Sequence, residues 1–395
     1  MSTELGPEVR DPARVIVSPL RVPGLGNPAG LLVLRDGTVV IGTGCTLHSP
    51  RTHTEKTIYK IMKLSPSGSL ETLDTGWNMW LNYPNGMTED AGDIVFADTY
   101  SHSVRRIRGN TISTVAGGVD MSMTSFAKEM AKSTYSCNPC HLQGFRDARG
   151  AEARFSFPEC VLAAHGMLVV ADTQNHVIRV IARDGWVRTL AGNGRSGAVD
   201  GEGLAAQFEA PASLALDIDG SILVADGNAL RRVTMEGTVT TVAGRTDEEG
   251  FADGTGANAR FAMICNVVVD GDGVIVVADQ LNHCLRKIVR DGAGVLVTTL
   301  AGVPGRDRNT GDGSGAVFML SNPTTLALDE RGRVLVSENP PLDDTMWVVD
   351  ASLAPRFPDR ALAFAMSQHT RLGKGSAASS LDAELMKLIL DMRCT

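Results

Sequence analysis

Residues 171–226 read ADTQNHVIRVIARDGWVRTLAGNGRSGAVDGEGLAAQFEAPASLALDIDGSILVAD. Short runs rich in β-branched residues alternate here with turn signals such as Asp219-Gly220. Runs of this composition form strands, and an Asp-Gly pair tolerates the positive φ of a tight turn. The stretch therefore predicts antiparallel strands joined by short turns.

The same pattern recurs along the chain. Six turn glycines are each followed six residues later by an acidic residue, except in the first copy, where Thr43 stands instead. The glycines are Gly37, Gly92, Gly166, Gly220, Gly273 and Gly332, and the acidic residues are Asp98, Asp172, Asp226, Asp279 and Glu338. Each copy but the last holds four strand-like runs, and small sheets of this kind bury their faces by stacking around an axis. We predict an all-β, six-bladed β-propeller of four-stranded antiparallel blades over residues 14–370.

The last blade lacks a clear fourth strand. We predict that the run from Arg14 to Val17 supplies it, because an unpaired chain end would leave a sheet edge exposed. The alternative donor is the run from Ala361 to Met366.

The stretch from Ala171 to Asp226 resembles an NHL repeat, and weaker copies cover roughly residues 14–350. The resemblance to the NHL-repeat family implies a six-bladed propeller. It leaves the activity open, because related folds host binding modules as well as hydrolases and lyases. The first copy departs from the pattern at Thr43, and the last has Glu338 followed by NPPLDD.

Composition limits the class of protein. The 395 residues are 43% hydrophobic and 21% charged, which is typical of a globular protein. A net charge of −8 argues against a general nucleic-acid binder, although RNA binding stays open. Seven scattered cysteines and no apolar leader indicate a reducing compartment, so we expect a cytoplasmic protein with no membrane partner.

The acidic positions and the Asn-His pairs are predicted to lie on one face, which carries the longer loops. We interpret the acidic residues as turn residues whose oxygens accept backbone N–H groups; the alternative is a ring of carboxylates for Ca²⁺. The histidines are interpreted as structural, with Ala229 at the matching place in the fourth copy; the alternative is a Zn²⁺ site. The candidate partner face comprises Asp98, His102, Asp172, Asn175, His176, Asp226, Asp279, Asn282, His283 and Glu338, and the metal candidates are Asp172, Asp279, His176 and His283. We expect no cofactor, with Ca²⁺ or Zn²⁺ only under the alternative.

Four arginines also share one repeat position. We interpret Arg105, Arg179, Arg231 and Arg286 as partners in blade-to-blade ion pairs with the acidic residues rather than as an RNA surface. The loops DGEG, DGTG and DGSG, which begin at Asp200, Asp253 and Asp312, are interpreted as turns that lead to a docked phenylalanine. Blade 2 carries the degenerate copy DARG from Asp147.

Two segments depart from the repeat. The insertion at 118–145 contains Cys137, Cys140 and His141 in the spacing for haem attachment. Without an export signal or a helical cytochrome domain, we interpret it instead as an exposed loop with an oxidisable cysteine pair. Residues 371–380 read as a flexible linker, and 381–394 as an amphipathic helix that either docks on the propeller or contacts another chain.

Two functions are compatible with these patterns. We predict a non-catalytic platform that binds a protein or peptide on the loop-rich face, because like residues repeat around the ring instead of forming one pocket of unlike groups. The alternative is a metal-dependent hydrolase or lyase, lactonase-like or amidating-lyase-like, that uses the axial channel. No G-x-S-x-G motif offers a serine nucleophile.

Overall fold

The computed structural model describes residues 9–10, 16–22, 25–49, 54–73, 81–118, 142–291, 294–306, 319–339 and 345–350. They belong to the first of two compact units, Met1–Ala354. The predicted linker and helix at 371–394 lie outside the described residues. The same holds for most of the 118–145 insertion, with Cys137, Cys140 and His141.

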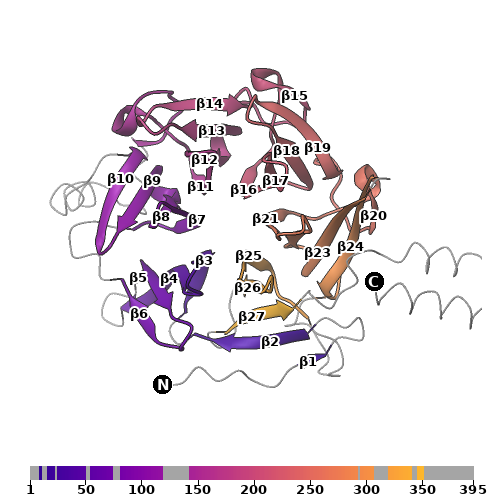
Figure 1. Cartoon of the computed structure of the whole chain (residues 1–395), viewed down its shortest axis with the longest axis horizontal. Helices are drawn as coiled ribbons and strands as arrows, with labels where there is room; N and C mark the ends of the chain where they lie inside the picture. The colour runs from indigo at the N-terminus through magenta and orange to yellow at the C-terminus, as the bar shows by residue number, and fades with distance from the viewer. Residues whose placement is uncertain are drawn as a thin grey trace, which may run out of the picture. The chain divides into compact units, whose positions relative to one another are not determined.

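Strands stand around a common centre in Figure 1, and the first strand of each group lies nearest to it. Each innermost strand contacts the next, and the last contacts the first. In ring order they are β3 (Asn27–Val33), β7 (Pro84–Asp90), β11 (Pro158–Ala164), β16 (Pro211–Leu216), β21 (Ile264–Val269) and β25 (Pro323–Leu328). The predicted all-β, propeller-like arrangement is confirmed.

Further strands follow each innermost strand outward, and each pairs antiparallel with its predecessor. The second strands are β4 (Val39–Ser49), β8 (Asp93–Asp98), β12 (Met167–Asp172), β17 (Ile222–Asp226), β22 (Ile275–Asp279) and β26 (Val334–Glu338). The third are β5 (Thr54–Leu64), β9 (Ser103–Arg108), β13 (Val177–Ile181), β18 (Ala229–Val233), β23 (Cys284–Asp291) and β27 (Thr345–Asp350). The fourth are β6 (Leu70–Thr72), β10 (Thr111–Gly117), β14 (Val187–Ala191), β19 (Thr238–Gly244) and β24 (Gly294–Gly302).

The described strands form five hydrogen-bonded sheets, which corrects the expectation of six separate four-stranded sheets. Strands β7–β10 and β11–β14 share one eight-stranded sheet, because β7 and β11 pair in parallel at Gly86 and Cys160. Gly86 permits this approach, since a Cβ there would lie 2.4 Å from the Cys160 Cα. Three other sheets have a fifth strand at the outer edge: β1 (Val9–Arg10), β15 (Gly201–Glu202) and β20 (Gly254–Thr255).

The N-terminal segment closes the ring. Strand β2 (Ile16–Arg21) pairs antiparallel with β27, from Ile16 opposite Asp350 to Arg21 opposite Thr345. The predicted donor is confirmed, with its strand beginning two residues later and extending further than expected. The alternative donor, 361–366, lies outside the described residues.

Apolar side chains fill the spaces between neighbouring sheets. In one such core, Val169 and Val180 of one sheet pack with Leu214 and Phe208 at the next. Phe208, like Phe155 and Phe261, has no exposed surface, which confirms the prediction of a docked phenylalanine after three of these loops. The fourth loop, at Asp312, lies outside the described residues.

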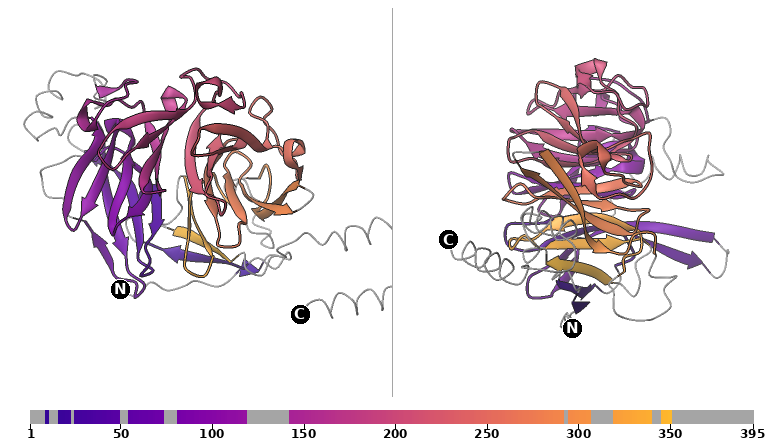
Figure 2. Two further views of the ribbon diagram at one scale, coloured as in Figure 1. Left: turned by 45° about the horizontal axis from the view of Figure 1, so that its top comes forward. Right: turned by 90° about the vertical axis from the view of Figure 1, so that its right-hand side faces the viewer.

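The described helices are single 3₁₀ turns: η1 (Thr99–Ser101), η3 (Gly150–Glu152), η4 (Thr173–Asn175), η5 (Gly203–Ala205) and η6 (Gly256–Asn258). Among the residues described, none of these is a candidate for a membrane span. One hairpin breaks the outline of the ring, because β4 and β5 extend well past the other sheets (Figure 2).

Candidate functional site

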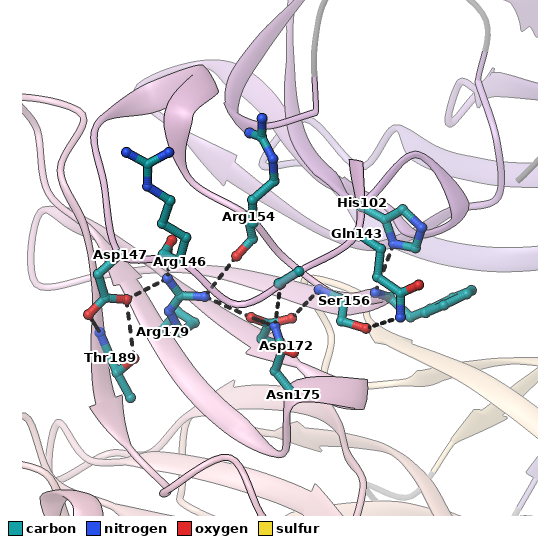
Figure 3. A network of polar contacts seen from close by, with 12 residues as sticks. His102, Gln143, Arg146, Asp147, Arg154, Ser156, Asp172, Asn175, Arg179 and Thr189 are labelled. Carbon is teal, nitrogen blue, oxygen red and sulfur yellow. Dashed lines mark hydrogen bonds and ion pairs between the residues drawn. The ribbon is translucent and has the colours of Figure 1, made fainter. Parts of the chain in front are cut away.

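The acidic residue that ends each second strand is an internal anchor. Asp172, at the end of β12, has no exposed surface. Its Oδ1 accepts the Ser156 N–H at 2.7 Å, and its Oδ2 accepts Asn175 Nδ2 and Arg179 Nη1, both at 2.8 Å (Figure 3). Burial raises the pKa of Asp172 to about 6 against the lowering effect of Arg179, so the group is a carboxylate at neutral pH.

Arg179 on β13 joins this anchor to the loop that precedes β11. Its Nη2 lies 2.5 Å from Oδ1 of Asp147, whose Oδ2 accepts the N–H of Thr189 on β14 at 3.0 Å (Figure 3). The guanidinium carbon lies 5.1 Å from the ring centre of Phe155. The predicted ion pair with the acidic residue is confirmed, but both residues lie on adjacent strands of the same group, which corrects the expectation of a pair between neighbouring blades. The loop acid makes Arg179 a bridge between two carboxylates.

The bridge recurs in the next two groups of strands. Arg231 bonds Asp226 at 3.0 Å and Asp200 at 2.7 Å, and Arg286 bonds Asp279 at 2.8 Å and Asp253 at 2.7 Å. The loops at Asp200 and Asp253 are therefore more than the turns that the sequence predicts. They supply the second carboxylate, and β15 and β20 from the same loops pair with the outer strands β19 and β24.

These anchors are closed to a partner. Asp98, Asp172, Asp226, Asp279 and Glu338 have 0% exposed surface. In the two groups without the arginine bridge described above, Asp98 pairs with Arg105 at 2.6 Å and Glu338 accepts the Trp347 indole N–H at 2.9 Å. The acids serve the fold, and the prediction that they belong to a partner face is corrected for these five residues.

The three histidines connect neighbouring groups of strands through hydrogen bonds to backbone groups. We call a residue with this role a latch. All three end the turn after an anchor with positive φ, at 51° for His102, 55° for His176 and 55° for His283. His102 Nδ1 accepts the Phe157 N–H at 3.1 Å, and His283 Nδ1 accepts the Asn322 N–H at 3.2 Å. His176 Nδ1 lies 2.6 Å from the carbonyl oxygen of Glu209. His102 is fully buried, so it too leaves the predicted partner face.

The fourth group uses asparagine as its latch. Asn228 Oδ1 accepts the Met263 N–H at 2.8 Å, which is the same kind of contact. The sequence pattern predicts Ala229 at this place. In the structure, Ala229 is instead the strand partner of Asp226, which is the place that Val177 takes opposite Asp172. The turn is two residues shorter here, so the latch position moves to Asn228.

The two asparagines before the histidines complete the turns. Asn175 donates to Asp172 and to the Gly144 carbonyl, each at 2.8 Å. Asn282 donates to Asp279 at 2.9 Å and to the Gly250 carbonyl at 2.8 Å. Their amide groups are thus engaged within the fold.

The metal candidates do not gather into one site. Within the described ranges, no group of three or more His, Cys, Asp or Glu side chains lies close enough to hold an ion. Asp172 and Asp279 bond their own arginines, and His176 and His283 bond backbone groups of the next group of strands. With their side chains engaged in these bonds, the four residues do not fit a Ca²⁺ or Zn²⁺ centre.

A different set of equivalent residues lies at the inner wall of the ring. Every innermost strand begins with a break in register of the β-bulge kind, which re-aims a side chain. The residue that follows the one paired with the acidic anchor, or with Thr43 in the first group, fills one repeat position, in ring order Ala29, Asn85, Glu159, Ala212, Cys265 and Thr324. In β7 the break itself lies one residue later, at Gly86. We call these six residues the axial set. Glu159 is its charged member.

Glu159 is partly exposed, yet the surrounding strands remove much of its hydration. This burial raises the pKa of Glu159 to about 7. Its charge raises the pKa of Tyr83 and of Cys265, which belong to two other groups of strands. This effect on residues of two other groups of strands is what we expect of a carboxyl that faces the centre of the ring. Within the described part of the chain, no hydrogen bond or ion pair engages its side chain.

Four partly exposed aromatic residues come from the strands around Glu159: Phe157 stands two residues before it, and Tyr83 precedes the strand β7 that pairs with β11. Successive ring centres lie 5.8 Å apart from Tyr59 to Tyr83, 5.1 Å from Tyr83 to Tyr100, and 5.7 Å from Tyr100 to Phe157. Three of the chain's four tyrosines thus gather here, although only 5% of its residues are aromatic. We call these four residues the aromatic strip.

The parallel pair between β7 and β11 accounts for the position of the strip. Tyr83 directly precedes β7 and Phe157 directly precedes β11, so the contact of Gly86 with Cys160 brings the two residues close enough for Tyr100 to contact both rings. Burial and its neighbours raise the pKa of Tyr83 to about 12, so this phenol is neutral at physiological pH.

The sequence patterns did not point to Glu159 or to the strip. A signal for Glu159 was present: four innermost strands begin with proline, at Pro84, Pro158, Pro211 and Pro323, and the next residue is charged only after Pro158. The clustering of the tyrosines depends on contacts between separate repeats, which the repeat pattern alone does not show.

Comparison with known proteins gives limited matches. No family model matches the chain, so NHL-repeat membership stays a prediction. Protein SUPPRESSOR OF QUENCHING 1, chloroplastic, of Arabidopsis thaliana is 40% identical over 90 residues. The match takes in 22% of this chain and only 8% of that protein.

Solved structures with a similar arrangement include a streptogramin B lyase, with a TM-score of 0.48 and 13% identity over 85% of this chain and 97% of that one. A gluconolactonase from Xanthomonas campestris has a TM-score of 0.48 and 11% identity, over 88% of this chain and 96% of that one. The nidogen/laminin complex has a TM-score of 0.44 and 13% identity, over 71% of this chain and 82% of that one. Similarities this low assign no activity to this chain.

Proposed function

We propose that the ring is a six-bladed β-propeller of the NHL-repeat type in which two blades are bridged. The closed cycle of six innermost strands supports this proposal, as does the register break that begins each of them. On this proposal, the eight-stranded sheet is two blades joined at Gly86 and Cys160.

We further propose that the protein is a platform that binds a protein or peptide partner on the face that carries the aromatic strip. The strip is the observation that carries the proposal. Partly exposed tyrosines are frequent anchors in protein interfaces, since they bury a large area at a low cost in side-chain entropy. Met263 and Leu281, 47% and 48% exposed, add apolar surface on the same face of another blade.

A peptide fits this surface better than a nucleic acid does. The repeated arginines are fully buried, or 6% exposed in the case of Arg105, and bonded to carboxylates, so they offer no basic groove. Binding of single strands needs such a groove next to stacking rings. A chain with a net charge of −8 repels phosphates instead.

A selection from a random peptide library on the immobilised full chain tests this proposal. We expect recovered peptides to lose at least about tenfold in affinity when Tyr100 and Phe157 are both replaced by serine. The control is Trp186→Ser, because Trp186 is 53% exposed in the turn between β13 and β14, at the opposite face. Recovery of no peptide, or equal losses in both variants, would contradict the platform.

Glu159 supports a second candidate, a lactonase-like or amidating-lyase-like enzyme at the axial channel. A carboxyl with a pKa near 7 suits a general acid or base at neutral pH. The names of the lyase and gluconolactonase neighbours agree with this candidate but do not carry it.

Turnover of a panel of lactones, with and without added Ca²⁺ or Zn²⁺, tests the enzyme. Catalysis predicts a rate above the uncatalysed one that falls at least about a hundredfold in Glu159→Gln, within the range for loss of a general acid or base. Equal rates for the two proteins, or no rate above background on any lactone, would remove this candidate.

A further inference from the structure

We propose that the inner end of the aromatic strip receives the ammonium or guanidinium group of a basic side chain from the partner peptide, with Glu159 as its counter-charge. This inference rests on the proposed platform function. It adds the chemical class of the ligand and the residue that selects it.

The first step is the uncompensated carboxyl. The acids that end the second strands all have side-chain partners, as Asp172 has Arg179 and Asp98 has Arg105. Glu159 has none among the described residues, although the strands around it remove much of its hydration. A poorly hydrated carboxylate gains most from a cation that brings its own hydrogen-bond donors.

The second step is the chemistry of the neighbouring rings. An organic cation is attracted to the faces of tyrosine and phenylalanine, and a dehydrated site strengthens this attraction. Phe157 stands two residues before Glu159, and Tyr83, whose pKa the charge of Glu159 raises, directly precedes the strand β7 that pairs with β11. Rings and one carboxylate together suit an ammonium or guanidinium group.

A metal ion fits this place less well. Ca²⁺ takes six to eight oxygen ligands, and Zn²⁺ three or four protein ligands. In the described residues, no three His, Cys, Asp or Glu side chains gather, and the other members of the axial set are Ala29, Asn85, Ala212, Cys265 and Thr324. One carboxylate and one amide do not replace the hydration shell of either ion.

The third step is the length of the strip, which favours a peptide over a small amine. Its three ring-to-ring steps of 5.8, 5.1 and 5.7 Å lead from Phe157 to Tyr59, at the base of the long β4–β5 hairpin. An extended peptide rises by about 3.3 Å per residue, so the strip offers apolar contact to several residues beside the basic one. The net charge of −8 attracts a basic segment.

Peptides recovered on the full chain provide the test, with affinities measured by calorimetry. We expect each to contain an arginine or lysine whose replacement by citrulline or norleucine weakens binding at least about tenfold. We expect Glu159→Gln to lower the affinity for the basic peptide by a similar factor and to leave the affinity for the neutral peptide unchanged. A double-mutant cycle gives this result when the two groups are in direct contact. Thermal unfolding of the variant shows whether it is folded, which we expect because the Glu159 carboxyl supports no other described group.

The matched control is Thr324→Val, at the equivalent place of the axial set on β25. It leaves the affinity unchanged under this inference. Peptides whose affinity depends on Tyr100 and Phe157 but not on Glu159 would overturn the inference, and so would an equal loss of affinity in Thr324→Val. Either result would leave the proposed platform function standing. Arginine amide that binds as tightly as the peptide would overturn the choice of a peptide ligand.

Discussion

At the scale of single residues, His102 shows how a buried latch couples stability to pH. Burial lowers the pKa of His102 to about 4 from its ordinary 6.5, so the folded protein holds it neutral while the unfolded chain is protonated below about pH 6.5. Stability from this residue is therefore present above pH 6.5 and is lost as the pH falls towards 4. The full loss is about 3 kcal/mol.

His102→Asn removes this titration and keeps the latch, because Asn228 already performs the same role in another group of strands. Asparagine also tolerates the positive φ of 51° at this position. Urea titration at pH 7 and at pH 4 gives the loss in the free energy of unfolding between the two pH values for each protein. We expect this loss to be about 3 kcal/mol smaller in the variant than in the parent. Parallel curves for the two proteins would show that His102 does not titrate in this way.

At the scale of elements, Gly86 decides how closely the strands β7 and β11 approach each other. A Cβ at this position would lie 2.4 Å from the Cys160 Cα and 2.6 Å from the Glu159 carbonyl oxygen, and both are backbone atoms. Gly86→Ala must push β7 and β11 apart. We expect a loss of about 1–3 kcal/mol in urea unfolding, together with weaker peptide binding, because the strip spans this pair.

Gly271→Ala is the matched control for this substitution. Gly271 lies in the turn between β21 and β22, and a Cβ there meets no atom within 4 Å. We expect it to change stability by less than about 0.5 kcal/mol. Equal effects at Gly86 and Gly271 would mean that the close approach of β7 and β11 is unimportant.

The elements also show how far the sequence predicts this protein. Turn glycines and anchors such as Asp172 recur at fixed intervals, so strand order, the arginine pairs and the docked phenylalanines follow from local patterns. The position of the latch at Asn228 instead of Ala229 does not follow from these patterns, because the two-residue deletion in this turn can be aligned with the other repeats in more than one way. Glu159 could have been found by comparing the residues that follow the strand-initial prolines, because it is the charged one among them. The aromatic strip could not be predicted in this way, because it depends on contacts between side chains from different groups of strands, which the comparison of repeats treats as unrelated.

At the scale of the whole molecule, ring closure depends on the pairing of β2 with β27. These strands come from opposite ends of the described chain and pair over six residues, from Ile16 to Arg21. Val17 has no exposed surface and packs in the core with Val336 and Val349. Removal of residues 1–21 leaves the edge of β27 unpaired and opens this core, and an open edge is a template for association between chains.

We expect the truncated protein to form oligomers in size-exclusion chromatography with light scattering, and to unfold at a lower temperature than the parent. A synthetic peptide of residues 14–22, RVIVSPLRV, should reverse the association and raise the melting temperature in proportion to the logarithm of its concentration, because it binds only the folded ring. A scrambled peptide of the same composition should do neither, since it cannot place its apolar residues on the core face in register with β27. A truncated protein that associates no more than the parent and is as stable would show that the ring closes without β2, and the pairing of β2 with β27 would then be a consequence of folding and not its condition.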